Sequence, residues 1–169
     1  MSTSPAFPVG STDAQWFTRN DDVMGGHSRS RVEVQGALLR FSGTTSLEDN
    51  GGFASIRVRG AFKLRDATAM RLRVRGDGRV YQLRLSTDAR YRDSRMSWRG
   101  EFHTRANEWI EATVVFADML PTWRGTVLDG PALDLSKVEE VGLLIADGQA
   151  GDFGLEVEWI RPQPPAGDD

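Results

Sequence analysis

Apolar residues alternate with polar ones along most of the chain after position 38, and this period of two constrains the fold more than any other feature of the sequence. Successive side chains of a β-strand point to opposite faces of a sheet, so the alternation predicts strands with one buried face. The alternating apolar residues are Leu39 and Phe41; Ile56 and Val58; Met70, Leu72 and Val74; Tyr81, Leu83 and Leu85; Ile110, Ala112, Val114 and Phe116; Leu143 and Ile145; and Phe153, Leu155, Val157 and Trp159.

Helical alternatives are short, and turn-forming residues separate the predicted strands. The helical candidates are residues 63–67, 116–120 and 136–140, each too short to form a packed layer. Gly76-Asp77-Gly78 lies between two strand patterns and predicts a tight hairpin loop. We therefore predict an all-β fold, a two-sheet antiparallel sandwich of the jelly-roll type.

The length of 169 residues suits one β-sandwich with a full core. Pro-rich and Gly-containing ends predict flexible tails at residues 1–10 and 162–169, around a single domain at residues 11–161. The absence of cysteine excludes disulfides, thiolate metal sites and cysteine nucleophiles, and the net charge of −3 argues against nucleic-acid binding. No apolar run reaches the roughly 18 residues of a membrane span, and the first residues lack the order of a secretory signal. We therefore expect a cytoplasmic protein.

Two segments, residues 20–28 and 46–53, interrupt the strand pattern with acidic residues, amides and paired glycines. Glycine pairs permit positive φ and close backbone approach, and the second pair precedes a strand, which favours a bulge or a sharp entry into the sheet. The glycines that we interpret as structural are Gly25, Gly26, Gly51 and Gly52.

The acidic part of the first segment, Asn20-Asp21-Asp22, offers oxygen atoms of the kind that calcium binds. Its spacing lacks the alternation of a dedicated calcium loop, and a hydrogen-bonded turn explains the same residues. We therefore predict no metal and no cofactor, and we expect the two segments to meet at one end of the sandwich as a polar rim.

Arginines occupy the polar positions of several predicted strands, so we expect one sheet face to carry an arginine stripe. The arginines concerned are Arg57, Arg59, Arg71, Arg73, Arg75 and Arg84. Guanidinium groups suit an anionic ligand, the hydroxyls of a glycan or an acidic protein surface. The alternative is a solvated face that acids partly neutralise, namely Glu33, Glu111, Glu156 and Glu158.

Five tryptophans raise the question of a sugar-stacking platform. Most of them fit core or strand-boundary positions, whereas Trp98 and Trp123 have polar neighbours and are expected at the surface. Catalysis has less support: His27 and His103 are the only histidines, and neither has the spacing of a nucleophile and base pair or of a two-histidine metal site. We predict no catalytic residues and no enzymatic activity.

Ordered motifs along most of the chain resemble the complex I intermediate-associated protein family. They include Trp16, Asn20 through Ser28, Leu39-Arg40-Phe41-Ser42-Gly43, Asn50 through Ser55, Tyr81 through Leu85, Trp109, Pro121 through Gly125, Val141 through Asp147, and Gly151 through Leu155. The resemblance implies a galactose-binding-like jelly roll without accepted enzymatic activity, whose mitochondrial members help to assemble respiratory complex I.

We therefore predict a non-catalytic binding or assembly domain that recognises a protein, with a respiratory-complex subunit as the partner that the resemblance implies. The predicted rim consists of Asn20, Asp21, Asp22, Ser28 and Asn50, and the predicted sheet face of Gln82, Arg84, Trp123 and Arg124. Arginine would give bidentate contacts and Trp123 apolar area. The alternative is a carbohydrate-binding module, with glycans in place of the protein partner and with Trp98 or Trp123 exposed in a groove.

Overall fold

The computed structural model describes residues 16–20, 26–35, 38–48, 52–60, 62, 64–92, 94–123 and 126–164. Several predicted site residues fall outside this part of the chain, namely Asp21, Asp22, Gly25, Asn50, Gly51 and Arg124. The predicted N-terminal tail also lies outside it.

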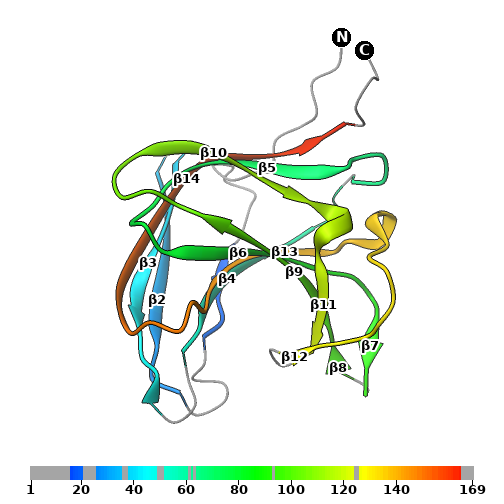
Figure 1. The fold of residues 1–169 in the computed structure, drawn as a ribbon, viewed down its shortest axis with the longest axis horizontal. Helices are drawn as coiled ribbons and strands as arrows, with labels where there is room; N and C mark the ends of the chain where they lie inside the picture. Colours follow the sequence, from blue (N-terminus) through cyan, green and yellow to red (C-terminus); the bar gives the residue numbers. More distant parts are fainter. Residues whose placement is uncertain are drawn as a thin grey trace.

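Two antiparallel sheets form the molecule (Figure 1). The seven-stranded sheet has the order β1 (Phe17–Thr18), β4 (Ala54–Arg59), β13 (Glu140–Ile145), β6 (Val80–Ser86), β9 (Ser97–His103), β11 (Leu120–Trp123) and β12 (Thr126–Val127). The five-stranded sheet has the order β10 (Trp109–Val115), β5 (Ala69–Arg75), β14 (Gly151–Gln163), β3 (Leu38–Thr45) and β2 (Arg29–Gln35). A small hairpin pairs β7 (Arg90–Tyr91) with β8 (Ser94–Arg95).

The core lies between the two sheets and consists of the alternating apolar residues. Phe41, Leu72 and Val157 from the five-stranded sheet are fully buried, as are Leu83 and Leu143 from the seven-stranded sheet. The rings of Phe41 and Phe153 meet edge to face in the core, with their centroids 4.9 Å apart. The prediction of an all-β, two-sheet antiparallel sandwich is confirmed.

Two of the three helical candidates become short 3₁₀ turns, at Phe116–Asp118 and Leu135–Lys137, and the described residues 64–67 contain no helix. The predicted hairpin at Gly76-Asp77-Gly78 is wrong, because β5 and β6 belong to different sheets. The segment crosses the end of the sandwich instead. The Asp77 carboxylate accepts hydrogen bonds from the Tyr81 hydroxyl and from the Gly154 amide of the opposite sheet, 3.1 and 2.8 Å long. Side-chain bonding across the sheets thus replaces strand pairing.

Strand β14 departs from strict alternation at a bulge between Val157 and Trp159. The extra residue changes which face the following side chains point to, so that Ile160 is fully buried and Trp159, predicted in phase with Val157, is only half-buried. The strand continues to Gln163, two residues into the segment predicted as the C-terminal tail.

The arginines do not share one face, contrary to the single stripe predicted. Strand β5 places its arginines on the outer face of the five-stranded sheet, where Arg71 pairs with Glu111 and Arg73 with Glu158. Strands β4 and β6 place the others on the seven-stranded sheet. The sequence period gives the phase of each strand but not the sheet to which the strand belongs.

Candidate functional site

The outer face of the seven-stranded sheet, here called the polar face, carries hydrophilic side chains in its central strands. Its residues are Ser55, Arg57 and Arg59 on β4; Glu140, Gly142 and Leu144 on β13; Gln82, Arg84 and Ser86 on β6; Ser97, Arg99 and Glu101 on β9; and Leu120 and Thr122 on β11. Most of the central members are buried, so these groups are largely withdrawn from water even though they point away from the core.

Arg84 lies at the centre of the polar face and is 8% exposed. Its Nε donates to Gln82 Oε1 at 2.9 Å, and its Nη1 donates to Ser97 Oγ and Thr122 Oγ1 at 2.7 and 2.8 Å. Thr122 Oγ1 also donates to the Ser97 carbonyl, 3.0 Å away. Three neighbouring strands therefore hold the guanidinium in one orientation, and every acceptor that they offer is uncharged.

A buried carboxylate organises the other side of the polar face. Glu140 is 1% exposed and accepts hydrogen bonds from Arg57 Nη1 at 3.3 Å and from Arg59 Nε at 3.2 Å. Arg19 and Arg95 lie 3.7 and 3.9 Å from the same carboxylate. Several cations surround one anion here, which compensates the burial of Glu140 and of Arg57.

Gly142 makes room for this arrangement, because it lies between Arg57 and Arg84 in the strand register. A Cβ atom at Gly142 would approach the Arg57 Cδ to 2.7 Å. The missing side chain thus lets Arg57 lie across β13 toward Glu140.

The two predicted site residues Gln82 and Arg84 are therefore adjacent and hydrogen-bonded, in an environment that lacks charge balance. Burial, together with the positive charges of Arg57 and Arg99, lowers the pKa of Arg84 to about 9. A lowered pKa means that the protonated guanidinium is disfavoured at this position relative to water.

The described rim residues lie beside the β4 edge of the polar face and tie segments together. Asn20 Oδ1 accepts hydrogen bonds from Ser30 Oγ at 2.6 Å and from the Ser55 amide at 3.2 Å. Ser28 is buried, and its Oγ accepts from the Ser46 amide at 2.9 Å. The flanks of the two glycine-containing segments thus come together, and both described side chains hold this junction.

The two tryptophans expected at the surface differ in their positions. Trp98 is 2% exposed in the core and its Nε1 donates to the Pro131 carbonyl, so its predicted surface position is wrong. The strand phase of β9, with Ser97 and Arg99 outward, places Trp98 inward. Trp123 is half-buried, and its ring centroid lies 5.1 Å from that of Tyr91.

Of the predicted structural glycines, Gly52 has a φ of +125°, a conformation that favours glycine. Gly26 is buried. The other two lie outside the described residues.

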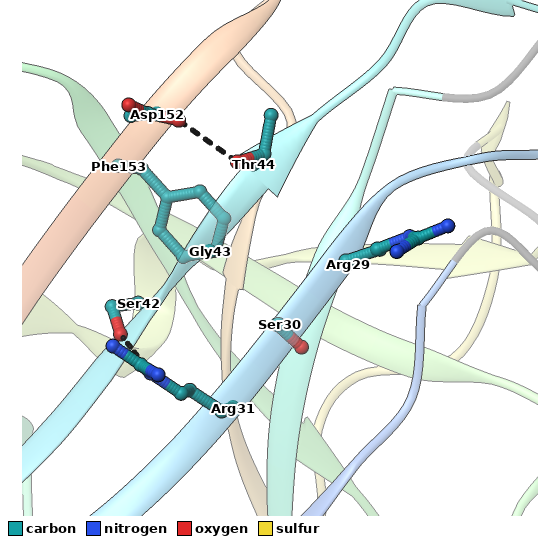
Figure 2. A pocket seen from close by; sticks show the side chains of 8 residues that line it. All are labelled: Arg29, Ser30, Arg31, Ser42, Gly43, Thr44, Asp152 and Phe153. Atoms are coloured by element: carbon teal, nitrogen blue, oxygen red, sulfur yellow. Dashed lines mark hydrogen bonds between the residues drawn. The ribbon is translucent and has the colours of Figure 1, made fainter.

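A shallow pocket of about 450 Å³ lies on the other sheet, over β2, β3 and the start of β14 (Figure 2). Arg31 borders it, and its Nε lies 3.4 Å from Ser42 Oγ and from Glu33 Oε1. Thr44 Oγ1 donates to Asp152 Oδ1 at 2.8 Å, between the neighbouring strands β3 and β14. Both arginines of the lining, Arg29 and Arg31, are exposed, so water already solvates their charges.

Sequence reasoning missed Arg99, Ser97 and Thr122 as members of the polar face. The alternation of β9 around Trp98 and Phe102 contains the signal for Ser97 and Arg99. Thr122 comes from a four-residue strand, too short for a period to be read.

The comparisons with known proteins decide the family. The family model described as "Complex I intermediate-associated protein 30 (CIA30)" matches residues 6–157. The chain belongs to the CIA30 family. The match spans nearly all described strands and confirms the resemblance found in the sequence motifs.

Curated relatives agree with the CIA30 assignment. The mouse mitochondrial complex I intermediate-associated protein 30 is 28% identical over 170 residues, covering 86% of this chain and 51% of the mouse protein. The Drosophila melanogaster protein of the same name is 33% identical over 127 residues, covering 64% of this chain and 42% of that protein. The chain thus spans about half, or less, of the length of these relatives.

Solved structures similar to this CIA30 chain include carbohydrate-binding modules. The family 11 module of the cellulase Lic26A-Cel5E of Clostridium thermocellum has a TM-score of 0.67 and 8% identity, with 97% of each chain covered. A point mutant of a family 29 carbohydrate-binding module has a TM-score of 0.57 and 9% identity, with 99% of this chain and 96% of that one covered. At such identities the likeness shows the fold alone, and it confirms the predicted galactose-binding-like jelly roll.

The expected cytoplasmic location is contradicted by the curated CIA30 relatives, which are named as mitochondrial proteins. Among the described residues, no group of three or more histidine or acidic side chains is arranged to hold a metal ion. No helix in the described part of the chain is long and apolar enough to cross a membrane.

Proposed function

We propose that this chain is a non-catalytic binding domain that recognises a protein partner during assembly of respiratory complex I, and that the polar face makes the contact. The names of the curated relatives support the assembly role. The proposed protein contact includes the predicted residues Gln82 and Arg84. Trp123, predicted on the same face, follows Thr122 on β11, so its side chain points to the opposite face of the sheet.

The observation that carries the proposal is the largely buried layer of polar side chains on an outer sheet face. An outer face that serves only solubility usually exposes flexible charged groups to water. Here Arg84, Gln82 and Thr122 are buried and fixed by mutual hydrogen bonds. Preorganised polar groups lose little conformational entropy when a partner binds, which favours specific recognition.

The test is affinity capture from the native host with the full-length protein and two bulky variants. Glu101→Trp lies opposite Gln82 on the polar face, and Thr113→Trp lies on an exposed position of β10 in the other sheet. We expect wild type and Thr113→Trp to capture complex I subunits and Glu101→Trp to lose them. Failure of the wild type to capture any subunit, or equal capture by both variants, would contradict the proposal.

Carbohydrate binding is the second candidate, and the pair of Tyr91 and Trp123 is the observation that favours it. Arg92 Cζ lies 5.4 Å from the centre of the Tyr91 ring and 5.7 Å from that of the Trp123 ring, so a polar group stands beside the aromatic surface. Saturable retention of glycans that Trp123→Ala abolishes, combined with no capture of respiratory subunits, would favour this candidate.

A further inference from the structure

Arg84 differs from the other deeply placed arginines of the protein in its partners. Arg57 is equally buried and bonds to the Glu140 carboxylate, and Arg79 bonds to the Asp147 carboxylate at 2.6 Å. Arg84 bonds only to an amide oxygen and two hydroxyls among the described residues. The protein therefore supplies orientation for this guanidinium without supplying a counter-charge.

The immediate neighbours of Arg84 make its charge less favourable. Arg99 is its Cα partner on β9, and like charges directly opposite each other destabilise a strand pair. Glu101 lies two residues further along the same face and forms no ion pair with either arginine in the described structure. A buried charge without compensation is strongly unfavourable, so the arrangement needs another explanation than stability.

Both arginines keep hydrogen-bond donors available. The three bonds of Arg84 use Nε and Nη1, and Nη2 has no partner among the described residues. Nη2 is also not one of the partnerless side-chain atoms that are sealed from solvent. Arg99 is half-buried and makes no hydrogen bond or ion pair within the described part of the chain. Two neighbouring guanidinium groups thus present donors at one place on the polar face.

We infer that Arg84 and Arg99 form a binding site for one carboxylate, that of an aspartate or glutamate side chain of the partner protein. A planar carboxylate can take the Nη2 donors of Arg84 on one oxygen and the Arg99 guanidinium on the other. One negative charge placed between the two arginines would weaken the repulsion between them. It would also compensate the unfavourable free energy of burying the Arg84 charge.

This site rests on the proposed function, because it names the chemistry by which the polar face would recognise its partner. The rest of the same face already uses carboxylate chemistry, since the Glu140 carboxylate forms ion pairs with Arg57 and Arg59. The narrow exposure of Arg84 favours a single flat group at the tip of a side chain over a bulkier tetrahedral anion. A carboxylate is therefore the group that we expect to bind Arg84 and Arg99.

The test uses purified full-length protein and N-acetyl-glutamate amide, a probe with one carboxylate, at constant ionic strength set with sodium chloride. Binding is followed through the assigned Nε–Hε signals of arginine in NMR spectra. We expect saturable shifts at Arg84 and Arg99, and a loss of affinity of about tenfold or more in Arg84→Met and in Arg99→Met. Arg71→Met, on the other sheet, serves as the control and should bind like wild type.

Folding of each variant is checked by urea unfolding. Arg84→Met removes an uncompensated charge, so it should be at least as stable as wild type, whereas an arginine kept for structure would leave a destabilised protein. Arg99 is only half-buried, so Arg99→Met tests the site without removing the buried hydrogen bonds at the centre of the polar face. Loss of stability in Arg84→Met, or affinities unchanged in both variants, would overturn the inference.

Inorganic phosphate under the same conditions distinguishes the two oxyanions, and tighter binding of phosphate than of the glutamate probe would also overturn the assignment. The outcomes of this test can be told apart from those of the capture experiment. If complex I subunits are captured equally by wild type and Arg84→Met, the carboxylate site fails while the proposed function stands. If the probe binds as expected but no subunit is captured, the proposed function fails.

Discussion

Ion pairs between single residues stabilise the ends of this sandwich. The pair of Arg79 and Asp147 is the strongest case. Arg79 donates to both oxygens of Asp147, at 2.9 and 2.6 Å, and also to the Gly151 and Asp152 carbonyls. The hydrogen bonds from Arg79 hold the pKa of Asp147 below its ordinary value. We expect Asp147→Asn to lower the free energy of unfolding at pH 7 by about 2–4 kcal/mol, because it leaves the half-buried Arg79 guanidinium without its anion.

The loss caused by Asp147→Asn should depend on pH. A carboxyl whose folded pKa lies below its unfolded pKa stabilises the protein fully above about pH 4, and this contribution disappears as the pH falls through the folded pKa. Urea unfolding at pH 7 and near pH 3 should thus show a difference between wild type and variant that shrinks in acid. Asp129→Asn, at an exposed position, is the control and should change little at either pH. An equal loss at both pH values would contradict the role of charge.

At the residue scale, the sequence predicted the centre of the candidate site but not its partners. Gln82 and Arg84 are polar positions of a strongly alternating strand, so their shared face could be read directly. Arg99 and Thr122 join them only through the strand order β6, β9 and β11, which local pattern does not encode. The charge imbalance around Arg84 depends on that order and was therefore not predictable.

At the element scale, Gly43 lets strand β2 lie close against β3. A Cβ atom at Gly43 would stand 2.0 Å from the Arg29 carbonyl oxygen and 2.7 Å from the Ser30 Cα, and backbone atoms cannot turn aside as side chains do. We expect Gly43→Ala to cost about 1–3 kcal/mol and to raise the amide exchange rates of β2 above those of β5. Gly154→Ala is the matched control, since its Cβ would meet nothing within 4 Å. Equal effects of the two substitutions would refute this role.

The existence and phase of the long strands followed from the sequence, whereas their connections did not. The period of two predicted the buried face of β5 and β6, but Gly76-Asp77-Gly78 looked like a hairpin because crossing and pairing connections use the same turn residues. The bulge in β14 reversed the expected positions of Trp159 and Ile160. The bulge was not predicted, because a single extra residue does not change the composition of a strand. Tertiary contacts, not local preference, decided both cases.

At the scale of the whole molecule, the two sheets share one core and should unfold together. Leu72 on β5 and Leu83 on β6 are both fully buried in it. We expect Leu72→Ala and Leu83→Ala each to cost about 2–5 kcal/mol. Each should also raise the slowest amide exchange rates of both sheets by a similar factor, in native-state hydrogen exchange. Val115→Ala, at an exposed position of β10, is the control. Faster amide exchange confined to the sheet that carries the substitution would show that the two sheets unfold as separate units.

Strand β2 stands at the end of the five-stranded sheet, so its outward backbone groups are a template on which a strand from a second copy could add. The exposed side chains Arg29, Arg31 and Glu33 alternate along that strand. Stacking of copies through β2 would crowd these ionic groups together and strip water from them. Charged side chains on an edge strand disfavour such addition, and the arginines that border the shallow pocket are among them.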